Sequence, residues 1–596
     1  MILGAALTAC GGALPARGVQ SGPTMQSATT PFGAFPGVKG TTFRVWAPKA
    51  KAVGVRLFRP STRTIALERH DDGVWSITAP DVGEGATYKF VVDDRELPDP
   101  GARFLPEGVH GPAEVVADHA PTTSFVPPKL DELVIYELHV GTFTDEGTYV
   151  AAMHELDQLA DLGVNAIELL PVAAFAGERG WGYDGVALYA PHAPYGRPEE
   201  LRAFVAAAHA RGIAVLLDVV YNHLGPAGNY FGAYTDEFLG KVDSPWGQGF
   251  AFDNRFVRTF VLENVRYWLE SFGFDGLRLD ATHAIIDDSP KHILEDIAQL
   301  AHGLVPRRIV IGEDERNDPT VMTRTGLDAV WADDFHHSVR VNLTREQDGY
   351  YKAYAPTLAE LAHTIDRGWL YEGQVYGPSG EKRGHPATGL ARGSFVYCIQ
   401  NHDQVGNRAL GTRLNHEVSI DAYLVATMLL LFLPQTPMLF QGQEWAASTP
   451  FVYFTDHEPD LGKLVTEGRR KEFAKFAAFA DPEQRAKIPD PQSRDSFVKS
   501  KLKWDERGQG DHARALALTR TMLHLRRDDA VLGGVHREEK PLQVRVEGQR
   551  LVVVRESAKG KRTLVLQLAG EPMPLPAGRV LLRSGEGVPF AALLAT

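Results

Sequence analysis

The pattern of apolar and polar residues divides the chain into three parts, the first of which reads as short strands. In residues 41–48 Phe43 and Val45 share one face, and residues 52–58 continue the alternation. Asp71-Asp72-Gly73 and Asp93-Asp94 stand where hairpin turns are expected. Because no helical period is present, residues 31–117 predict an N-terminal β-sandwich, and Pro127-Pro128 marks the linker after it.

Eight apolar, β-branched runs follow from residue 133. They lie at residues 133–141, 164–172, 213–223, 274–283, 308–315, 328–335, 394–403 and 434–444. Runs this apolar are typical of parallel strands covered on both faces. Amphipathic segments separate them, for example at 148–162, 199–211 and 255–272, and the last helix is expected at 512–527. This alternation predicts an α/β fold, a (β/α)8 TIM barrel spanning residues 118–533, with a short insertion at 224–254 after strand three.

The two ends of the chain complete the domain plan. Three β-runs at 542–546, 551–555 and 563–568, with a turn at Gly548, predict a small C-terminal β-domain over residues 534–596. Residues 1–30 are expected to be a poorly ordered tail. Within it, residues 7–10 resemble a lipoprotein cleavage site, but no Lys or Arg precedes the short apolar run, and Met25 is an alternative start.

Composition narrows the class of protein. The 596 residues are 44% hydrophobic and 23% charged, as in a globular protein, and the net charge is -13. This acidic balance argues against nucleic acid and anionic membrane surfaces as partners and suits a neutral or cationic small substrate. Two cysteines, Cys10 and Cys398, make no disulfide framework, so we expect a reducing, cytoplasmic location.

No apolar stretch reaches the roughly 18 residues that a membrane helix needs. The longest, residues 422–434, predicts a buried helix of a large core.

Charged residues stand at the carboxyl ends of five predicted strands, where the active site of a TIM barrel lies. Strands three to seven carry, in order, Asp218, then Arg278 with Asp280, then Glu313 to Glu315, then Asp333 with Asp334, and finally His402 with Asp403. A carboxylate in an apolar strand is costly to bury unless it is paired or used. Glycosidic bond cleavage needs such a rim, because one carboxylate attacks the anomeric carbon, another protonates the departing oxygen, and others stabilise the oxocarbenium-like transition state.

Four segments on this rim resemble the signature segments of the α-amylase family of glycoside hydrolases, in order and spacing. They are LLDVVYNH (216–223), GLRLDATH (276–283), VIGEDE (310–315) and QNHDQ (400–404). The N-terminal sandwich resembles the early-set domain of branching and debranching members. The resemblance implies that Asp280 is the nucleophile, Glu313 the general acid/base and Asp403 the transition-state stabiliser. It also implies a retaining mechanism, for which the two reacting carboxyls should lie roughly 5–5.5 Å apart.

The same resemblance implies sugar-binding residues around these acids. His223 and His402 would hydrogen-bond the sugar to be cleaved, and Arg278 would keep Asp280 ionised. Two interpretations stay open for Tyr183, a stacking ring or a loop cap, and for Asp218, a sugar contact or a structural acid. Asp314 is expected to point into the barrel wall. The predicted substrate-binding residues are Tyr183, Asp218, His223, Arg278, His283, Asp333, Asp334, His336, His337, Asn401, His402 and Gln404.

Segments outside the four signatures resemble one kind of member. Residues 180–196, 332–337, 400–408 and 454–473 are similar to those of the hydrolase that cleaves the α-1,4 bond next to the terminal trehalose of maltooligosyltrehalose. A branching enzyme is the alternative, but it would not be expected to carry Asp184 or the segments ADDFHH and DHEPDLG. A non-catalytic glucan-binding relative would have lost at least one of the three acids. The resemblance also implies that a maltooligosyltrehalose synthase acts before this enzyme.

Several residues on the rim have more than one interpretation. We expect a subset of these residues to bind the trehalose unit, first of all the group after strand six, and bracing of loops is the alternative. The candidates are Asp333, Asp334, His336 and His337 after strand six, with His283 and Gln404. The insertion adds Tyr230, Phe231, Trp246 and Phe252 as candidate sugar platforms. A metal pair at His336-His337 is disfavoured because neighbouring side chains on an extended segment point apart. No Asp/Asn cluster of the calcium-site kind is present, so we expect no metal and no cofactor.

Overall fold

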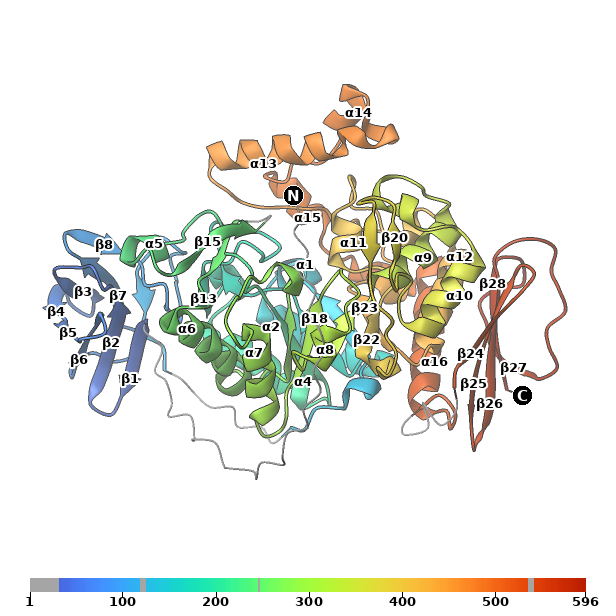
Figure 1. Cartoon of the computed structure of the whole chain (residues 1–596), viewed down its shortest axis with the longest axis horizontal. Coiled ribbons are helices and arrows are strands. Elements are labelled where there is room, and N and C mark those ends of the chain that lie inside the picture. The colour runs from blue at the N-terminus through green and yellow to red at the C-terminus, as the bar shows by residue number, and fades with distance from the viewer. Residues whose placement is uncertain (1–31, 118–124, 245–246, 534–540, 596) are drawn as a thin grey trace, which may run out of the picture.

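The computed structural model describes residues 32–117, 125–244, 247–533 and 541–595. Within them a β-sheet domain lies at one end, a closed barrel in the middle and a second β-sheet domain at the other end (Figure 1). The helices α13 (Pro459–Glu472) and α14 (Pro482–Ala486) lie above the barrel in that view. The expected tail at residues 1–30, with Cys10, lies outside the described residues.

The N-terminal domain consists of two antiparallel sheets, ordered β1-β2-β6-β5 and β4-β3-β7-β8, with β9 pairing β7. Both predicted hairpins are confirmed, because Arg69 pairs with Trp75 and Val92 with Arg95. The strands are β1 (Gly33–Gly37), β2 (Gly40–Trp46), β3 (Val53–Arg59), β4 (Arg63–Ala66), β5 (Glu68–Arg69), β6 (Val74–Ala79), β7 (Thr87–Val92), β8 (Arg95–Leu97) and β9 (Ala113–Glu114).

Eight parallel strands close the barrel in the order β10-β11-β14-β17-β18-β19-β22-β23. Each of the eight predicted runs contains one of them, so the predicted TIM barrel is confirmed. They are β10 (Ile135–Leu138), β11 (Ala166–Leu169), β14 (Ala214–Val219), β17 (Gly276–Leu279), β18 (Ile309–Glu313), β19 (Ala329–Trp331), β22 (Phe395–Tyr397) and β23 (Thr436–Phe440).

Alternate residues of these strands pack into two different cores, because successive side chains of a strand point to opposite faces. Ile135, Leu216 and Ile311 belong to the cluster that fills the barrel. Their neighbours Tyr136, Leu217 and Val310 belong to the larger cluster under the helices. Both faces are therefore buried, which explains why the runs are continuously apolar.

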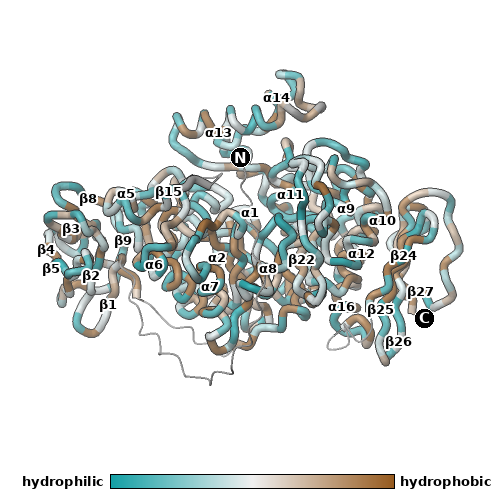
Figure 2. Tube along the Cα trace, viewed as in Figure 1, coloured by the Kyte–Doolittle hydropathy of each residue, from teal (hydrophilic) through white to brown (hydrophobic). Residues whose placement is uncertain are grey.

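Helices surround the barrel, and Figure 2 shows apolar stretches within this layer and polar ones along the outer loops. The described helices of the barrel region are α1 (Val140–Phe143), α2 (Tyr149–His154), α3 (Leu156–Leu162), α4 (Pro198–His209), α6 (Arg255–Arg266), α7 (Ile293–Gly303), α8 (Thr320–Thr323), α9 (Asp333–Thr344), α10 (Leu358–Arg367), α11 (His402–Gly406), α12 (Ile420–Phe432), α15 (Arg494–Lys499) and α16 (Gly510–Asp528). Helix α12 is buried from Ala422 to Phe432, which confirms the predicted core helix. No helix in the described ranges is long and apolar enough to cross a membrane.

The C-terminal domain is one five-stranded sheet in the order β24-β25-β26-β28-β27. The sequence predicted β24 (Gln543–Glu547), β25 (Arg550–Ser557) and β26 (Gly560–Gln567), whereas β27 (Arg579–Arg583) and β28 (Phe590–Ala595) were missed. Leu551 and Leu566 of this sheet meet Leu361 of α10 and Leu429 of α12. The sheet therefore packs on the outer side of the barrel helices.

The insertion after β14 contacts the N-terminal domain. Two of its predicted sugar platforms, Phe231 and Phe252, are buried, and Tyr230 stays a prediction. The insertion contains α5 (Phe231–Tyr234), β15 (Leu239–Ser244) and β16 (Gly247–Phe250). Phe231 is fully buried with its ring edge-on to Phe32, and Phe252 is 3% exposed. The expectation for these two residues is wrong, because both side chains are buried, and the Phe231 ring packs on Phe32 of the N-terminal domain. Trp246 lies outside the described residues.

Three short hairpins complete the described strands. They are β12 (Ala173–Ala174) with β13 (Ala187–Pro191), β15 with β16, and β20 (Gln374–Tyr376) with β21 (Glu381–Arg383).

Candidate active site

The polar residues at the carboxyl end of the barrel share the inward-facing parity of their strands. Asp218 stands two residues after Leu216, and Glu313 two residues after Ile311, so each points to the barrel axis. The register pairs Asp218 directly with Arg278 across β14 and β17. A charged layer thus caps the apolar interior, on the face where barrel active sites lie.

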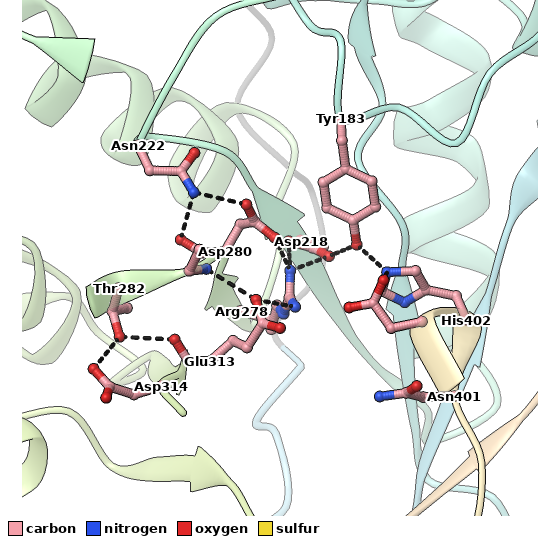
Figure 3. A network of polar contacts seen from close by, with 12 residues as sticks. Tyr183, Asp218, Asn222, Arg278, Asp280, Thr282, Glu313, Asp314, Asn401 and His402 are labelled. Carbon is pink, nitrogen blue, oxygen red and sulfur yellow. Dashed lines mark hydrogen bonds and ion pairs between the residues drawn. The ribbon is translucent and has the colours of Figure 1, made fainter. Parts of the chain in front are cut away.

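Arg278 is fully buried and binds three carboxylates of this layer (Figure 3). Its Nη1 donates to Asp218 Oδ2 at 2.7 Å and to Asp280 Oδ1 at 2.8 Å. Its Nη2 lies 2.8 Å from Glu313 Oε2. The expected ion pair between Arg278 and Asp280 is therefore present, and one guanidinium holds both candidate reacting carboxyls together.

Asp280 follows directly after β17 and keeps part of its carboxyl open to solvent. Asn222 Nδ2 donates to its Oδ2 at 2.9 Å, while Oδ1 accepts from Arg278. These bonds fix the carboxylate and satisfy its charge, as a nucleophile requires. Asn222 was noted beyond strand three but was not among the predicted site residues.

Glu313 is the last residue of β18, and its side chain is 20% exposed. Ala281 N donates to its Oε2 at 2.9 Å. Burial raises the pKa of Glu313 well above its ordinary value, and Asp280 and Asp403 add to this effect against the opposing Arg278. The direction is the one that a general acid needs, since the group must start protonated.

Asp403 lies in α11, whose first turn is set by its neighbour Asn401. Asn401 Oδ1 accepts from Gln404 N at 2.8 Å, as the cap of that helix. Asn407 Nδ2 donates to Asp403 Oδ1 at 3.0 Å. Burial raises the pKa of Asp403, partly offset by His402 and Arg278. Gln404 Oε1 is buried and has no hydrogen-bond partner among the described residues.

A chain of hydrogen bonds links β10 to β14 through the predicted sugar-binding residues. Glu137 Oε1 accepts from His402 Nδ1 at 2.6 Å, and His402 Nε2 lies 2.8 Å from Tyr183 Oη. Tyr183 donates to Asp218 Oδ2 at 2.6 Å. The Tyr183 ring also stacks on His402 at 5.2 Å. Tyr183 is thus a fixed member of the site rather than a cap of its own loop.

This chain sets the charge of His402. Burial lowers the pKa of His402, but Asp403 and Glu137 outweigh burial and raise it to about 9. His402 is therefore cationic at neutral pH. Asp218 has its pKa raised to about 6, chiefly by burial, and Arg278 opposes that rise.

Glu137 and Glu168 are the inward-facing acids that sequence reasoning missed. They pair in register across β10 and β11 and are each 1% exposed. Neither carboxyl oxygen of Glu168 has a hydrogen-bond partner among the described residues. Burial raises the pKa of Glu168 well above its ordinary value, and the neighbouring Glu137 and Asp218 add to this effect. The sequence signal that could have identified them is a single Glu in each of two otherwise apolar strands.

His223 follows Asn222 in the loop after β14, and its predicted contact with the sugar stays a prediction. Its Nδ1 is 2.6 Å from Asn222 Oδ1, and its Nε2 is 3.1 Å from the carbonyl of Tyr183. Burial lowers its pKa, although Asp280 and Asp184 oppose that effect. Asp314 points away from the site, as expected: it is buried and accepts from Thr282 Oγ1 at 2.9 Å.

The structure corrects the assignment of Asp334 to substrate binding. Asp334 is fully buried and accepts hydrogen bonds from Asn317 Nδ2, Tyr354 Oη and the backbone N–H of Leu370, each at 2.7 Å. All of its acceptor capacity is used to anchor the segments after β19. It therefore cannot contact a sugar.

Asp333, His336 and His337 lie on helix α9, so the expected extended conformation is wrong. His336 Nε2 lies 3.2 Å from Asp333 Oδ1. The His337 ring packs among Tyr350, Tyr351 and Tyr354. Of these, Asp333 is the most open, with 25% of its side chain exposed. A role in sugar binding stays a prediction for all three.

His283 stands three residues after Asp280, and its Nε2 lies 3.9 Å from Glu315 Oε1. Its role in sugar binding also stays a prediction. In the described ranges no group of three or more His, Cys, Asp or Glu is arranged to hold a metal ion.

Two parts of this architecture match known families, and relatives match the chain as a whole. Residues 31–118 match the family described as carbohydrate-binding module 48 (isoamylase N-terminal domain), and residues 140–246 match the α-amylase catalytic domain. The malto-oligosyltrehalose trehalohydrolase of Deinococcus radiodurans is 47% identical, over 95% of this chain and 95% of that protein. The protein of that name from Saccharolobus solfataricus is 43% identical, over 78% and 82%.

The chain belongs to the malto-oligosyltrehalose trehalohydrolase family. It is a glycoside hydrolase of the α-amylase type. A solved structure from Salmonella typhimurium, which carries the provisional name alpha amylase, covers 95% of this chain with 35% identity and a TM-score of 0.87. By contrast, a branching enzyme from Corynebacterium efficiens matches only 43% of this chain, at 33% identity. The trehalohydrolase relatives thus account for the whole domain plan, and the branching enzyme for part of it.

Proposed function

We propose that this trehalohydrolase-family chain hydrolyses the α-1,4-glucosidic bond next to the terminal trehalose of maltooligosyltrehalose and releases trehalose. The observation that supports it most directly is the binding of Asp280 and Glu313 by one buried guanidinium, with both carboxyls partly open to solvent. Two acids held together on one rim can act on the two sides of a single glycosidic bond.

In the first step Asp280 is the nucleophile and Glu313 the acid. A carboxylate oxygen of Asp280 attacks the anomeric carbon of the glucan, while the bond from that carbon to the trehalose oxygen breaks. Glu313 gives its proton to that oxygen, and trehalose leaves. Asp403 stabilises the positive charge that develops on the sugar ring. The product of this step is a β-linked glycosyl-enzyme.

In the second step water replaces trehalose. Glu313, now ionised, takes a proton from the water as its oxygen attacks the same carbon, and the ester bond to Asp280 breaks. The shortened glucan leaves with an α-configured end. Two inversions at one carbon give net retention.

The layout of the acids indicates which side holds which part of the substrate. The leaving trehalose must lie on the side of Glu313, because that residue protonates its oxygen. Tyr183 and His402 lie on the opposite side of Arg278 from Glu313 (Figure 3). We therefore assign the Tyr183 and His402 side to the glucan that stays bound, and the side of His283 and Asp333 to the trehalose.

Product analysis tests this function. The purified protein is incubated with maltotriosyltrehalose and separately with maltopentaose, and the products are separated by chromatography. We expect free trehalose and maltotriose from the first substrate and slower cleavage of the second. Formation of α-1,6 branches from linear amylose, detected by proton NMR, would support the branching enzyme instead.

Two context assignments accompany this function. Maltooligosyltrehalose must be supplied by an enzyme that converts the reducing end of a glucan into a trehalose unit, so we infer a maltooligosyltrehalose synthase as the preceding enzyme. We also infer a cytoplasmic location, supported by the low cysteine content and by the buried free thiol of Cys398.

A further inference from the structure

A cavity lies on the barrel rim, outside the cluster formed by Asp280, Glu313 and Asp403. It has a volume of about 670 Å³ and is lined by residues 105–110 of the N-terminal domain, by the loops after β10 and β11, and by Arg494 and Phe497 of α15. Asp280, Glu313 and Asp403 are not among its lining residues. Its volume falls in the range of about 300–1,000 Å³ that small-molecule sites occupy.

The walls of this cavity combine aromatic rings with charged groups of both signs. Phe497 is half-buried in one wall, while Glu107 and Arg494 line the cavity as exposed side chains. Arg179 is another lining residue, and its Nε is buried without a hydrogen-bond partner among the described residues. Apolar rings suit the C–H face of a sugar, and carboxylate and guanidinium groups suit its hydroxyls. Mixed charge favours neither an anion nor a cation, so a neutral sugar chain fits best.

Ion pairs and a hydrogen bond connect this cavity to the catalytic cluster through one layer of residues. Asp184, next to Tyr183, has its Oδ2 3.7 Å from Nε2 of His457. The neighbouring Asp456 binds Arg179 at 2.7 Å and accepts from the backbone N–H of Glu178 at 2.8 Å. Arg179 and Glu178 themselves line the cavity. The cavity and the Tyr183 side of the active site are therefore neighbours across residues 177–179 and 456–457.

The connecting layer presents one partly exposed carboxyl group, that of Asp184, beside the buried ring of His457. His457 is 5% exposed, and its Nδ1 has no hydrogen-bond partner among the described residues. The Asp184 carboxyl keeps 32% of its surface exposed, and burial of the rest raises its pKa. A chain of hydroxyl groups passing over this layer can donate to the exposed Asp184 carboxyl, which His457 holds in place from the buried side.

We propose that the 670 Å³ cavity is a remote subsite for the distal part of the α-glucan chain, reached across Asp184 and His457. This inference rests on the proposed function, which places the glucan on the Tyr183 side and the trehalose on the Glu313 side. A long substrate then binds at both the active site and the cavity. Once the reacting end is bound, the distal glucan is held near the cavity at high effective concentration, which adds affinity. Short substrates end before they reach the cavity.

The test compares substrates of increasing length. KM is measured for maltooligosyltrehaloses from two to about ten glucosyl residues on the trehalose unit, in the wild type and in Glu107→Trp, which fills the cavity from an exposed position. Phe497→Ala is a second variant that removes a wall without filling the space. We expect the wild-type KM to fall at least about threefold with length, which corresponds to about 0.7 kcal/mol of added binding, and we expect each variant to lose this dependence.

Glu68→Trp is the matched control, since Glu68 is an exposed glutamate of the same domain outside the cavity lining. It should keep the wild-type dependence on length. A wild-type KM that is independent of length, or a dependence that survives in both cavity variants, would overturn the remote subsite while trehalose release still stands. Absence of trehalose from every substrate would instead contradict the proposed function, and soaking Glu313→Gln crystals with maltoheptaose would then show directly whether the cavity holds glucan.

Discussion

Nη2 of Arg278 lies 2.8 Å from Oε2 of Glu313, and yet the pKa of Glu313 is raised. Burial is the main cause, and the negative charges of Asp280 and Asp403 add to it. The cation alone would lower the pKa. When Asp280 becomes an ester in the proposed mechanism it loses its charge, so the pKa of Glu313 falls at the stage where this residue must act as a base.

The requirement for a protonated Glu313 predicts how kcat/KM falls at alkaline pH. Because the acid must start protonated, kcat/KM should decline as pH rises through the raised pKa of Glu313. Below that pKa Glu313 stays protonated, so its titration causes no decline. Glu313→Gln should lose about 10²–10⁴-fold in kcat with trehalose as the leaving group. A maltosyl fluoride needs no protonation of its leaving group, so the variant should keep most of the first-step rate on it. Equal losses on both substrates would contradict the acid role.

Retention of configuration follows if Asp280 forms the covalent intermediate. Proton NMR during the first minutes should show the α-anomer of the released glucan, with the β-anomer arising later by mutarotation. Asp280→Ala should lose nearly all turnover and keep the wild-type far-UV circular dichroism spectrum and melting temperature. Asp403→Asn should do the same. Initial appearance of the β-anomer would show that water, and not Asp280, attacks the sugar.

Glu137 is predicted to act through His402, since its Oε1 accepts from His402 Nδ1 at 2.6 Å. Glu137→Gln removes one of the charges that raise the pKa of His402 to about 9, so this pKa should fall toward 6.5. Below the lowered pKa His402 is protonated in both proteins, so kcat of the variant should be closest to the wild-type value there. At pH 8 His402 of the variant is neutral, and kcat should differ more. NMR titration of His402 and the pH profile of kcat check this. Glu199→Gln, at an exposed glutamate, is the control.

Asp334 should affect stability rather than specificity. Asp334→Asn disturbs a buried carboxylate that accepts four hydrogen bonds, so a loss of about 1–3 kcal/mol is expected, seen as a lower melting temperature. The preference for trehalose-ended substrates should stay at the wild-type value. A lost preference at unchanged melting temperature would return Asp334 to the substrate site.

The sequence predicted the fold where periodicity was strong. The eight barrel strands and the hairpins at residues 71–73 and 93–94 were recovered because continuous apolar runs and turn residues are local signals. β27 and β28 were missed because residues 579–583 and 590–595 pair with each other across a loop and depend on tertiary packing. The roles of the three acids stay predictions that the variants above test, and the domain boundaries also stay predictions.

Side-chain direction was harder to predict than strand position. Asp333 and Asp334 are adjacent acids at the end of the apolar run 328–335. Because helix α9 begins at Asp333, Asp334 points inward to its buried partners, and the sequence does not show this. Phe231 and Phe252 are aromatic residues of the insertion, but the sequence does not show that both are buried, Phe231 against the N-terminal domain. Glu137 was missed although the argument that a carboxylate in an apolar strand must be paired or used applies to it.

The measurement that tests the central claim most directly is kcat/KM of the wild type for maltotriosyltrehalose against maltopentaose, two substrates with the same number of glucose units. They differ only in whether the leaving disaccharide is trehalose or maltose. The account predicts a preference of at least about tenfold for the trehalose-ended substrate, a difference of about 1.4 kcal/mol in transition-state binding. Equal values for the two substrates would contradict it.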